Sequence, residues 1–428
     1  MTRVIIVGAG IGGIATALAL RRGGIEHVVL EQAPRLTEVG AGIQLSPNGT
    51  RILDWLGVSP ALAAAAVEPA SHVFRHWQTG ETLLELPLGP AVRETFGVPY
   101  LHAHRADLLA AMLDAQGDRD LRLGCRVVAV RQDSSGVEAV LEDGTIERGS
   151  ILVGADGIHS LVRDLVFAPA APLERVLDRA AVQGDSYAAW RGLVPGETAS
   201  ALGIERRSYI WLGPGRSVVL YYVSGGRLLN WIGIGRSDEA KRESWSATGS
   251  VEGLLADFAG WHPQIVGLMA ATERPFITRL HDREPLASWV EGRVVLLGDA
   301  AHAMLPYHAQ GAVQSLEDAW VLARSVAMAA PSGVGASTRH RGPIEEALVR
   351  YQTLRRDRAT QVQAYSRAAQ DWYHVSDPVE IARRDERFRA VARRGDAGFS
   401  SQQEWLYVYD AEKAALGEDH AWRAMKWR

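Results

Sequence analysis

The N-terminal segment contains three glycines, Gly8, Gly10 and Gly13, at the spacing of a loop that holds the phosphates of a dinucleotide. An apolar run at 4–7 precedes them and a helix-forming run at 14–22 follows, which is the strand, turn and helix order of such a site. We expect Gly8 to permit the tight turn, Gly10 to let a pyrophosphate approach, and Gly13 to let the helix pack closely on the strand. The positive N-terminus of the helix would face the phosphates; the alternative is a tight turn with no ligand.

A second strand-like run, 27–30, ends at Glu31, 18 residues after Gly13. At this place a carboxylate accepts hydrogen bonds from a ribose and repels a 2′-phosphate. We therefore expect Glu31 and the adjacent Gln32 to contact the nucleotide. These residues alone do not distinguish NAD from FAD.

Two distant segments repeat the pattern of an apolar strand that runs into a glycine turn. The first is 151–157, Ile-Leu-Val-Gly-Ala-Asp-Gly, which contains Asp156. The second joins a strand at 294–297 to a helix that begins near Ala312, through Gly298, Asp299, Pro306 and Gly311. An NAD-dependent dehydrogenase would leave both of these segments without a role.

The three glycine motifs stand in the order and spacing of one known family. In them the chain resembles the FAD-dependent aromatic hydroxylases, which are single-component flavoprotein monooxygenases built like para-hydroxybenzoate hydroxylase. The resemblance also covers 40–48, 104–108 and 190–192. The segment 404–411, Glu-Trp-Leu-Tyr-Val-Tyr-Asp-Ala, resembles the tail of the salicylate-hydroxylase-like members, to which the chain is most similar.

The resemblance implies roles for several residues toward FAD. Asp299 would bind the ribityl hydroxyls, and the backbone N–H groups of Gly311 and Ala312 would stabilise negative charge on the reduced ring. Arg105 would lie along the phosphates or the ribityl chain, unless it forms a surface ion pair with Asp107. The other implied FAD contacts are Pro306, beside the ring, and the backbone of Val128, at adenine.

The resemblance also implies a transient site for NADH or NADPH as the electron donor. Asp156 and Arg163 would organise the pyrophosphate and the reduced nicotinamide. The alternative is that Asp156 caps a helix and Arg163 faces solvent. The salicylate-hydroxylase-like tail favours NADH.

In this family NAD(P)H reduces FAD, O₂ adds at flavin C4a, and the hydroperoxide transfers one oxygen to an electron-rich aromatic ring. The pocket must be apolar, because water near the hydroperoxide favours its loss as hydrogen peroxide. We expect the lining to come from short alternating runs within 184–275, although each aromatic could instead belong to the core. The candidates are Tyr187, Trp190, Tyr209, Trp211, Tyr221 and Tyr222.

The segment from Pro306 to Gly311 should lie beside the flavin ring. Salicylate hydroxylases tend to have Pro-His here, whereas this chain has Tyr307 followed by His308. We expect Tyr307 or His308 to be catalytic, as a donor to a phenolate or as a base, and the alternative is loop packing. His302 is expected to be a structural hydrogen-bonding residue.

Composition limits the class of protein. The 428 residues include 46 Lys and Arg against 50 Asp and Glu, a formal charge of −4, which argues against nucleic acid and anionic membranes as partners. The lone Cys125 forms no intramolecular disulfide, and no Cys/His spacing predicts a metal site, so we expect a cytoplasmic protein without metal. The expected partners are O₂ and a small phenolic or hydroxybenzoate-like substrate, with a larger aromatic natural product as the alternative. The chain should be a monomer or homodimer.

Two further classes of protein share some of these features. A flavin halogenase would have the same fold, but the sequence has no W-x-W-x-I-P segment. A non-catalytic FAD-binding protein is not excluded by these motifs.

The expected fold class is α/β. A Rossmann-like FAD-binding domain would be assembled from 1–70, 99–183 and 276–343, with an inserted antiparallel-sheet substrate domain from 71–98 and 184–275. A helical C-terminal region would follow at 344–428. Within it we expect a long helix over 345–373, whose arginines form a solvated face, and a tail that packs on the FAD domain or on a second subunit.

Overall fold

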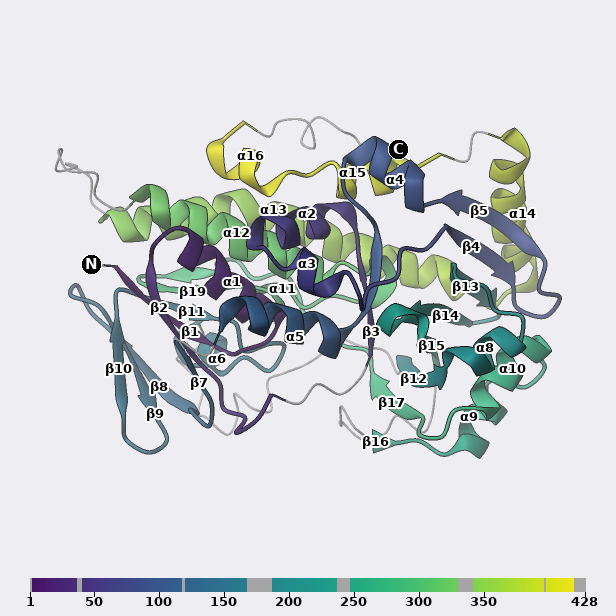
Figure 1. Cartoon of the computed structure of the whole chain (residues 1–428), viewed down its shortest axis with the longest axis horizontal. Helices are drawn as coiled ribbons and strands as arrows, with labels where there is room; N and C mark the ends of the chain where they lie inside the picture. Colours follow the sequence, from purple (N-terminus) through teal and green to yellow (C-terminus); the bar gives the residue numbers. More distant parts are fainter. Residues whose placement is uncertain are drawn as a thin grey trace.

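The computed structural model describes residues 2–36, 41–117, 120–167, 187–236, 247–329, 342–395 and 398–418. Two large β-sheets lie in different parts of the molecule, and the helix α13 (Pro343–Tyr373) extends from one to the other (Figure 1). Among the described residues, no helix is both long and apolar enough to cross a membrane.

The first sheet has six strands in the order β18-β19-β11-β1-β2-β7 and confirms the predicted Rossmann-like architecture. Its central strands are continuous apolar runs because both faces of the sheet are covered. β1 pairs in parallel with β2 and β11, so the glycine motifs that follow β1 and β11 lie at the same edge. The strands are β1 (Arg3–Val7), β2 (Glu26–Leu30), β7 (Leu121–Arg122), β11 (Ile151–Gly154), β18 (Val290–Glu291) and β19 (Val294–Leu296).

Smaller elements complete this part of the chain. One three-stranded sheet contains β8 (Val127–Gln132), β9 (Val137–Leu141) and β10 (Ile146–Gly149), and β3 (Gly42–Leu45) pairs with β6 (Leu101–His104). The helices are α1 (Ile11–Arg22), α2 (Pro47–Leu56), α3 (Ser59–Leu62), α4 (Gly89–Phe96), α5 (Arg105–Gln116), α6 (Leu161–Phe167), α11 (Asp299–His302) and α12 (Gly311–Ala329).

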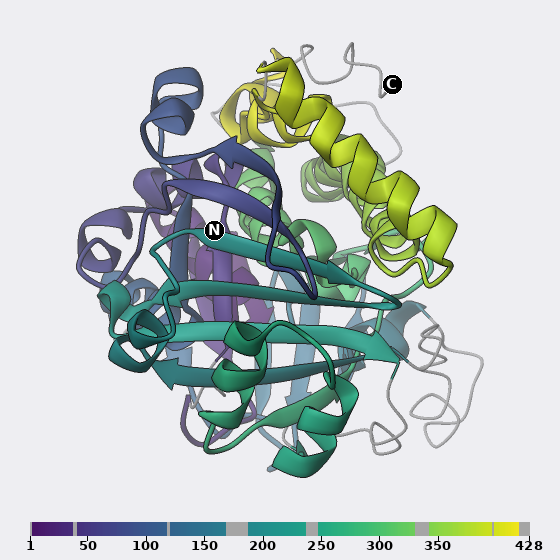
Figure 2. The same ribbon diagram turned by 90° about the vertical axis from the view of Figure 1, so that its right-hand side faces the viewer.

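The second sheet has eight strands in the order β16-β17-β12-β15-β14-β13-β4-β5. One face packs against the short helices α8 (Gly196–Ala201), α9 (Val251–Asp257) and α10 (Pro263–Ala270). In Figure 2 the green helices of this group lie in front of the lower strands and below them. The strands are β4 (Ser71–His76), β5 (Thr82–Pro87), β12 (Tyr187–Pro195), β13 (Ser208–Gly213), β14 (Arg216–Val223), β15 (Leu228–Arg236), β16 (Ala247–Thr248) and β17 (Phe276–Arg279).

The predicted boundary at residue 275 needs correction. β17 pairs antiparallel with β12, so 276–279 is a strand of the second sheet. The alternation of that strand is too short to separate it from the loop that follows it in sequence. The predicted boundary at 183–184 lies outside the described residues.

The C-terminal region is helical, with α13 followed by α14 (Pro378–Arg394), α15 (Ser401–Tyr407) and α16 (Ala411–Leu416). Trp405 and Tyr409 are almost fully buried in the same core as the first sheet. The tail therefore packs on the FAD-binding part of its own chain.

A cluster of buried charges joins α12 to α13 and contradicts the predicted solvated face. Arg355 and Arg358 are fully buried, as are Glu317 and Asp318 on α12. Arg358 Nε donates to Glu317 at 2.8 Å, and Arg355 Nε donates to Asp318 at 2.8 Å. Sequence periodicity overlooked these arginines because an ion pair can neutralise charges on a helix face that is packed and not exposed.

The same cluster extends to the turn after β19. Asp318 accepts a hydrogen bond from the backbone N–H of Gly298 at 3.0 Å and contacts His302 Nε2 at 2.5 Å, which agrees with a structural role for His302. Burial alone would raise the pKa of Asp318, but the charges of His302 and Arg355 outweigh it and hold this pKa at about 2. Asp318 thus stays ionised in the folded protein.

We expect Arg355→Met to lower the free energy of unfolding by about 3–5 kcal/mol, because it leaves buried carboxylates without their partner. Arg356→Met is the matched control, since the neighbouring side chain is 38% exposed and should contribute about 1 kcal/mol or less. Urea denaturation followed by tryptophan fluorescence measures both. An equal decrease in the free energy of unfolding of the two variants would contradict a stabilising role for the buried charge cluster.

Candidate active site

A cavity of about 1050 Å³ lies where the two sheets and the C-terminal helices meet. One end is lined by the turns of all three glycine motifs, and the other by strands of the second sheet. The motif residues in the lining are Gly10, Gly12, Ala155, Gly157, Gly298, Asp299, Gly311 and Ala312. Segments about 300 residues apart in sequence are thus brought to one site, as the motifs predicted.

The glycine turn after β1 has the three geometries that the sequence predicted. Gly8 has a φ of +104°, and a Cβ there would lie 2.5 Å from the Ala155 carbonyl oxygen. A Cβ on Gly13 would lie 1.9 Å from the Gly8 carbonyl oxygen, so helix and strand are in close contact. A Cβ on Gly10 would meet no atom within 4 Å, which leaves the open approach that a bound phosphate needs.

Glu31 lies next to this turn at the end of β2. Its carboxylate accepts hydrogen bonds from the backbone N–H groups of Ala9 and Ala33, both at 2.8 Å. Gln32 is exposed beside it, and Val128 on β8 is 39% exposed. None of these three predicted nucleotide contacts lines the cavity itself, so their roles stay predictions.

Asp156 and Arg163 have structural contacts in the turn after β11. Asp156 accepts hydrogen bonds from Ser160 Oγ at 2.5 Å and from the backbone N–H of Val162 at 3.1 Å, which caps α6. Arg163 is buried, not solvated, and donates to the carbonyl oxygen of Ala300 at 3.2 Å. These contacts join the second glycine motif to the third; the expected contact with nicotinamide stays a prediction.

Asp299 lines the cavity together with the glycine motifs, and its contact with flavin stays a prediction. It is exposed to the cavity, and no hydrogen-bond or ion-pair partner for it is found among the described residues. Gly298 before it has φ +58° and ψ −143°, a backbone conformation that is essentially restricted to glycine. The N-terminus of α12, at Gly311 and Ala312, lies in the same part of the lining, as does Arg105.

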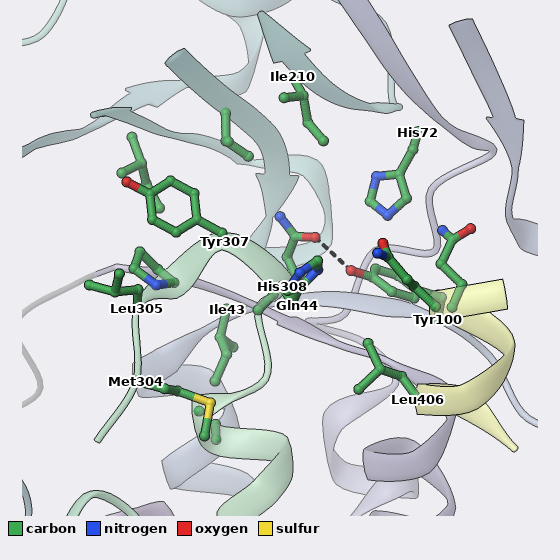
Figure 3. Close-up of a pocket in the computed structure, with 18 of the residues that line it drawn as sticks. Ile43, Gln44, His72, Tyr100, Ile210, Met304, Leu305, Tyr307, His308 and Leu406 are labelled. Atoms are coloured by element: carbon green, nitrogen blue, oxygen red, sulfur yellow. Dashed lines mark hydrogen bonds between the residues drawn. The ribbon is translucent and has the colours of Figure 1, made fainter. Parts of the chain in front are cut away.

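The far end of the cavity is an apolar chamber against the second sheet (Figure 3). Alternate residues of each strand face it, because successive side chains of a strand point to opposite faces. The sheet residues in the lining are His72, Phe74, Leu84, Leu86, Arg191, Ile210, Ser217, Val219, Tyr221, Ile232 and Ile234.

This alternation overturns most of the predicted pocket aromatics. Only Tyr221 of the six lines the cavity. Tyr187 packs on His374 with ring centroids 5.1 Å apart. The other four are buried on the opposite face, in the core with α8–α10: Trp190, Tyr209, Trp211 and Tyr222. Residue type alone did not reveal which side chains of each strand face the chamber.

Polar groups gather at one corner of the chamber, and Tyr221 is the one of them that the sequence singled out as a pocket residue. The Tyr100 hydroxyl donates to Gln44 Oε1 at 2.6 Å, and His72 lies edge-on to the Tyr100 ring (Figure 3). Burial raises the pKa values of Tyr100 and Tyr221 and lowers the pKa of His72 to about 4. Near neutral pH this corner therefore presents phenol O–H donors and an uncharged imidazole.

Arg191 also lines the chamber and has no hydrogen-bond or ion-pair partner for its guanidinium among the described residues. Burial lowers its pKa, although the guanidinium remains charged. Asp299 is the one carboxylate in the described lining, against four arginines, namely Arg105, Arg191, Arg387 and Arg394. The cavity is therefore suited to anionic ligands.

Tyr307 and His308 both line the cavity, as predicted for residues beside the flavin. The Tyr307 hydroxyl points away from the Gln44–Tyr100 pair in Figure 3 and lies 3.4 Å from His374 Nδ1. The other ring nitrogen of His374 lies 2.9 Å from Ser217 Oγ. Burial lowers the pKa of His308 to about 4, so its imidazole is neutral at physiological pH.

The C-terminal segment supplies a wall of the chamber that the sequence did not reveal. Leu406 and Tyr407 line the chamber, and so do residues 398–403. Arg358 donates to the carbonyl oxygen of Leu406 at 3.0 Å, which holds this wall against the buried charge cluster. The aromatic run at 405–409 is the sequence feature that could have indicated this wall.

Comparison with known proteins agrees with this geometry. The FAD binding domain family model matches residues 1–185 and 269–364, two segments that meet at the glycine end of the cavity. The chain belongs to this family. The 3-amino-4-hydroxybenzoate 2-monooxygenase of Streptomyces cremeus is 37% identical over 389 residues, which cover 91% of this chain and 92% of that protein.

Two solved structures are similar to this FAD-binding protein over nearly its whole length. HpxO of Klebsiella pneumoniae, solved with FAD, is 29% identical with a TM-score of 0.77 and covers 93% of this chain and 97% of that one. A salicylate hydroxylase substrate complex is 25% identical with a TM-score of 0.77 and covers 97% of both chains. Together these relatives show an FAD-dependent aromatic monooxygenase.

The residues present fit FAD. Three groups line the same cavity: open space at Gly10, the carboxylate of Asp299, which has no partner among the described residues, and the N-terminus of α12. They suit a pyrophosphate, a ribityl chain and a ring that becomes anionic on reduction, respectively.

We expect Gly10→Ala and Gly13→Ala to separate ligand binding from folding. Gly10→Ala should fold normally yet bind FAD at least tenfold more weakly, because its methyl group would fill the phosphate approach. Gly13→Ala should fail to fold stably, because its Cβ would overlap backbone. Thermal melting of the apoprotein and FAD titration by flavin fluorescence measure the two effects. Unchanged FAD affinity in folded Gly10→Ala would remove this phosphate site.

Proposed function

We propose that this monooxygenase uses NAD(P)H and O₂ to hydroxylate a small hydroxylated aromatic monocarboxylate. The carrying observation is a chamber that combines apolar walls, a phenol-donor corner and the unpaired guanidinium of Arg191. The names of two relatives, an aminohydroxybenzoate monooxygenase and a salicylate hydroxylase, describe substrates of this class.

Arg191 would bind the substrate carboxylate. A guanidinium that lines an apolar chamber without a partner is costly, and a planar carboxylate satisfies it with two parallel hydrogen bonds. The aromatic ring would then lie against apolar walls such as Ile210 and Leu406.

The phenol-donor corner would activate the ring for attack. Tyr100 and Tyr221 keep their protons because their pKa values are raised. Each hydroxyl could turn from Gln44 and donate its one hydrogen bond to a substrate oxygen as that oxygen becomes a phenolate. A phenolate makes the ring more electron-rich. Bound FAD would supply the activated oxygen, and the apolar walls would keep water away from the reaction.

NAD(P)H remains the proposed reductant, with NADH preferred. Arg163 is buried and forms an ion pair with Asp164 at 3.1 Å, so it offers no free positive charge for the 2′-phosphate of NADPH. A large kcat/KM preference for NADPH would overturn the choice of NADH.

We expect Arg191→Leu to raise KM for benzoate-type acids by about 10- to 150-fold, equivalent to one charge-assisted hydrogen-bonded contact of about 1.5–3 kcal/mol. The assay follows NADH oxidation and product formation for 3-amino-4-hydroxybenzoate, salicylate and 3-hydroxybenzoate. The corresponding amides are the control, because they lack the charge and should lose little. Equal effects on acids and amides would contradict carboxylate binding by Arg191. No hydroxylated product from any acid in the wild type would contradict the proposed function.

Tyr307→Phe and His308→Ala test the flavin-side residues. If either residue activates the substrate, its variant should retain FAD and oxidise NADH, while product per NADH falls and hydrogen peroxide rises. A general-base contribution of ~10²–10⁴-fold on the hydroxylation step is large enough for peroxide release to exceed it. His374→Phe is a companion variant, because it removes the partner of the Tyr307 hydroxyl without touching the lining. Unchanged coupling in all three variants would show that this loop only packs.

A further inference from the structure

The cavity opens to solvent beside α14 as well as at its flavin end. Among its described lining residues, Arg105 and Asp299 are exposed at the flavin end. The remaining exposed lining residues are Arg387, Val391, Arg394, Gly398, Ser400, Ser401 and Gln402. With FAD in the glycine end, the exposed residues beside α14 leave an approach for a small molecule within the described part of the chain.

Two arginines at this mouth differ from the other arginines of α14. Of the six on the helix, four pair with carboxylates: Arg383 with Glu380, Arg384 with Asp385, Arg389 with Glu81, and Arg393 with Glu386. For Arg387 and Arg394, no such partner is found within the described part of the chain, and both line the cavity. The two arginines of this helix that lack a carboxylate partner among the described residues thus face the mouth.

Helix geometry places an apolar side chain between these charges. Arg387, Val391 and Arg394 stand at i, i+4 and i+7, on one face, with about 10 Å along the helix axis between the arginines. Val391 is 37% exposed, in contrast to the buried Phe388 on the inner side. This face combines positive charge with apolar surface, and its size is comparable to that of one aromatic ring with its carboxylate.

The face is held in place by packing. Phe388 stacks on Phe74 with ring centroids 4.6 Å apart, and Arg389 Nη2 lies 2.7 Å from Glu81 on the hairpin of β4 and β5. Figure 2 shows α14 lying beside this hairpin. The arginines therefore stand on a fixed wall of the mouth.

We propose that Arg387, Val391 and Arg394 form an entry site that captures aromatic carboxylate anions and directs them toward Arg191. This inference rests on the proposed function, since it assigns the route of that substrate. Positive charge at a cleft mouth raises the local concentration and the association rate of an anion, and salt screens the effect. The aromatic ring of the substrate would contact Val391, while its carboxylate passes from the guanidiniums of Arg387 and Arg394 to that of Arg191.

The test compares association rates in the FAD-loaded enzyme. The double variant R387Q/R394Q should bind 3-amino-4-hydroxybenzoate about 3- to 10-fold more slowly at low ionic strength, with kcat at saturation unchanged. Stopped-flow changes in flavin absorbance measure the association rate constant. The difference should vanish in about 0.5 M salt, where the Debye length is only a few ångströms. The uncharged 3-amino-4-hydroxybenzamide should associate equally fast with both proteins.

The matched control is R383Q/R393Q, which removes the same charge from the same helix at arginines that are paired and outside the lining. It should leave association of the acid within about twofold of the wild type. Equal slowing by both double variants, or no slowing by R387Q/R394Q, would overturn the entry site while wild-type turnover still supports the proposed function. A raised KM for NADH with unchanged association of the acid would assign the face to the nucleotide and also overturn the proposal.

Discussion

The pairing of Glu317 and Asp318 on α12 with Arg355 and Arg358 on α13 is the constraint on which the site depends. Four charged side chains without solvent contact are tolerated only when each finds an opposite charge at hydrogen-bonding distance. The two helices therefore have one permitted register. α12 begins in the cavity at Gly311, less than two turns before these carboxylates, so the pairing also sets where its N-terminus points.

The same cluster reaches the other walls of the cavity. Asn48 on α2 donates to Glu317 at 2.6 Å, and Asp318 receives the backbone N–H of Gly298, where the third glycine motif turns. Arg358 holds the C-terminal wall through the Leu406 carbonyl oxygen. The flavin end and the closing wall of the chamber are consequently coupled through one buried network, although they are far apart in sequence.

The two ends of the cavity carry different chemical groups. Phosphate and ribityl groups would meet backbone N–H groups and Asp299 at the glycine end, whereas the substrate end has apolar walls, neutral phenols and guanidiniums. Burial keeps the phenol of Tyr221 protonated and the imidazole of His308 uncharged. The phenol can therefore act as a hydrogen-bond donor, and among the described lining residues no charged imidazole stands beside it. Such an arrangement would suit the proposed substrate, an aromatic anion, and would keep water away from its ring.

Sequence alone determined the dinucleotide fold and the convergence of three glycine motifs, because those depend on local backbone geometry: a positive φ at Gly8, close packing at Gly13 and strand-to-turn order. It also placed Asp299, Tyr307 and the start of α12 at the cavity. Only the tertiary structure decided which face of each strand met the chamber, since Trp211 and Ile210 alternate along one strand and either could have faced inward. It also decided that Arg355 and Arg358 are internal, because a charged helix face looks the same in sequence whether water or a carboxylate on another helix neutralises it.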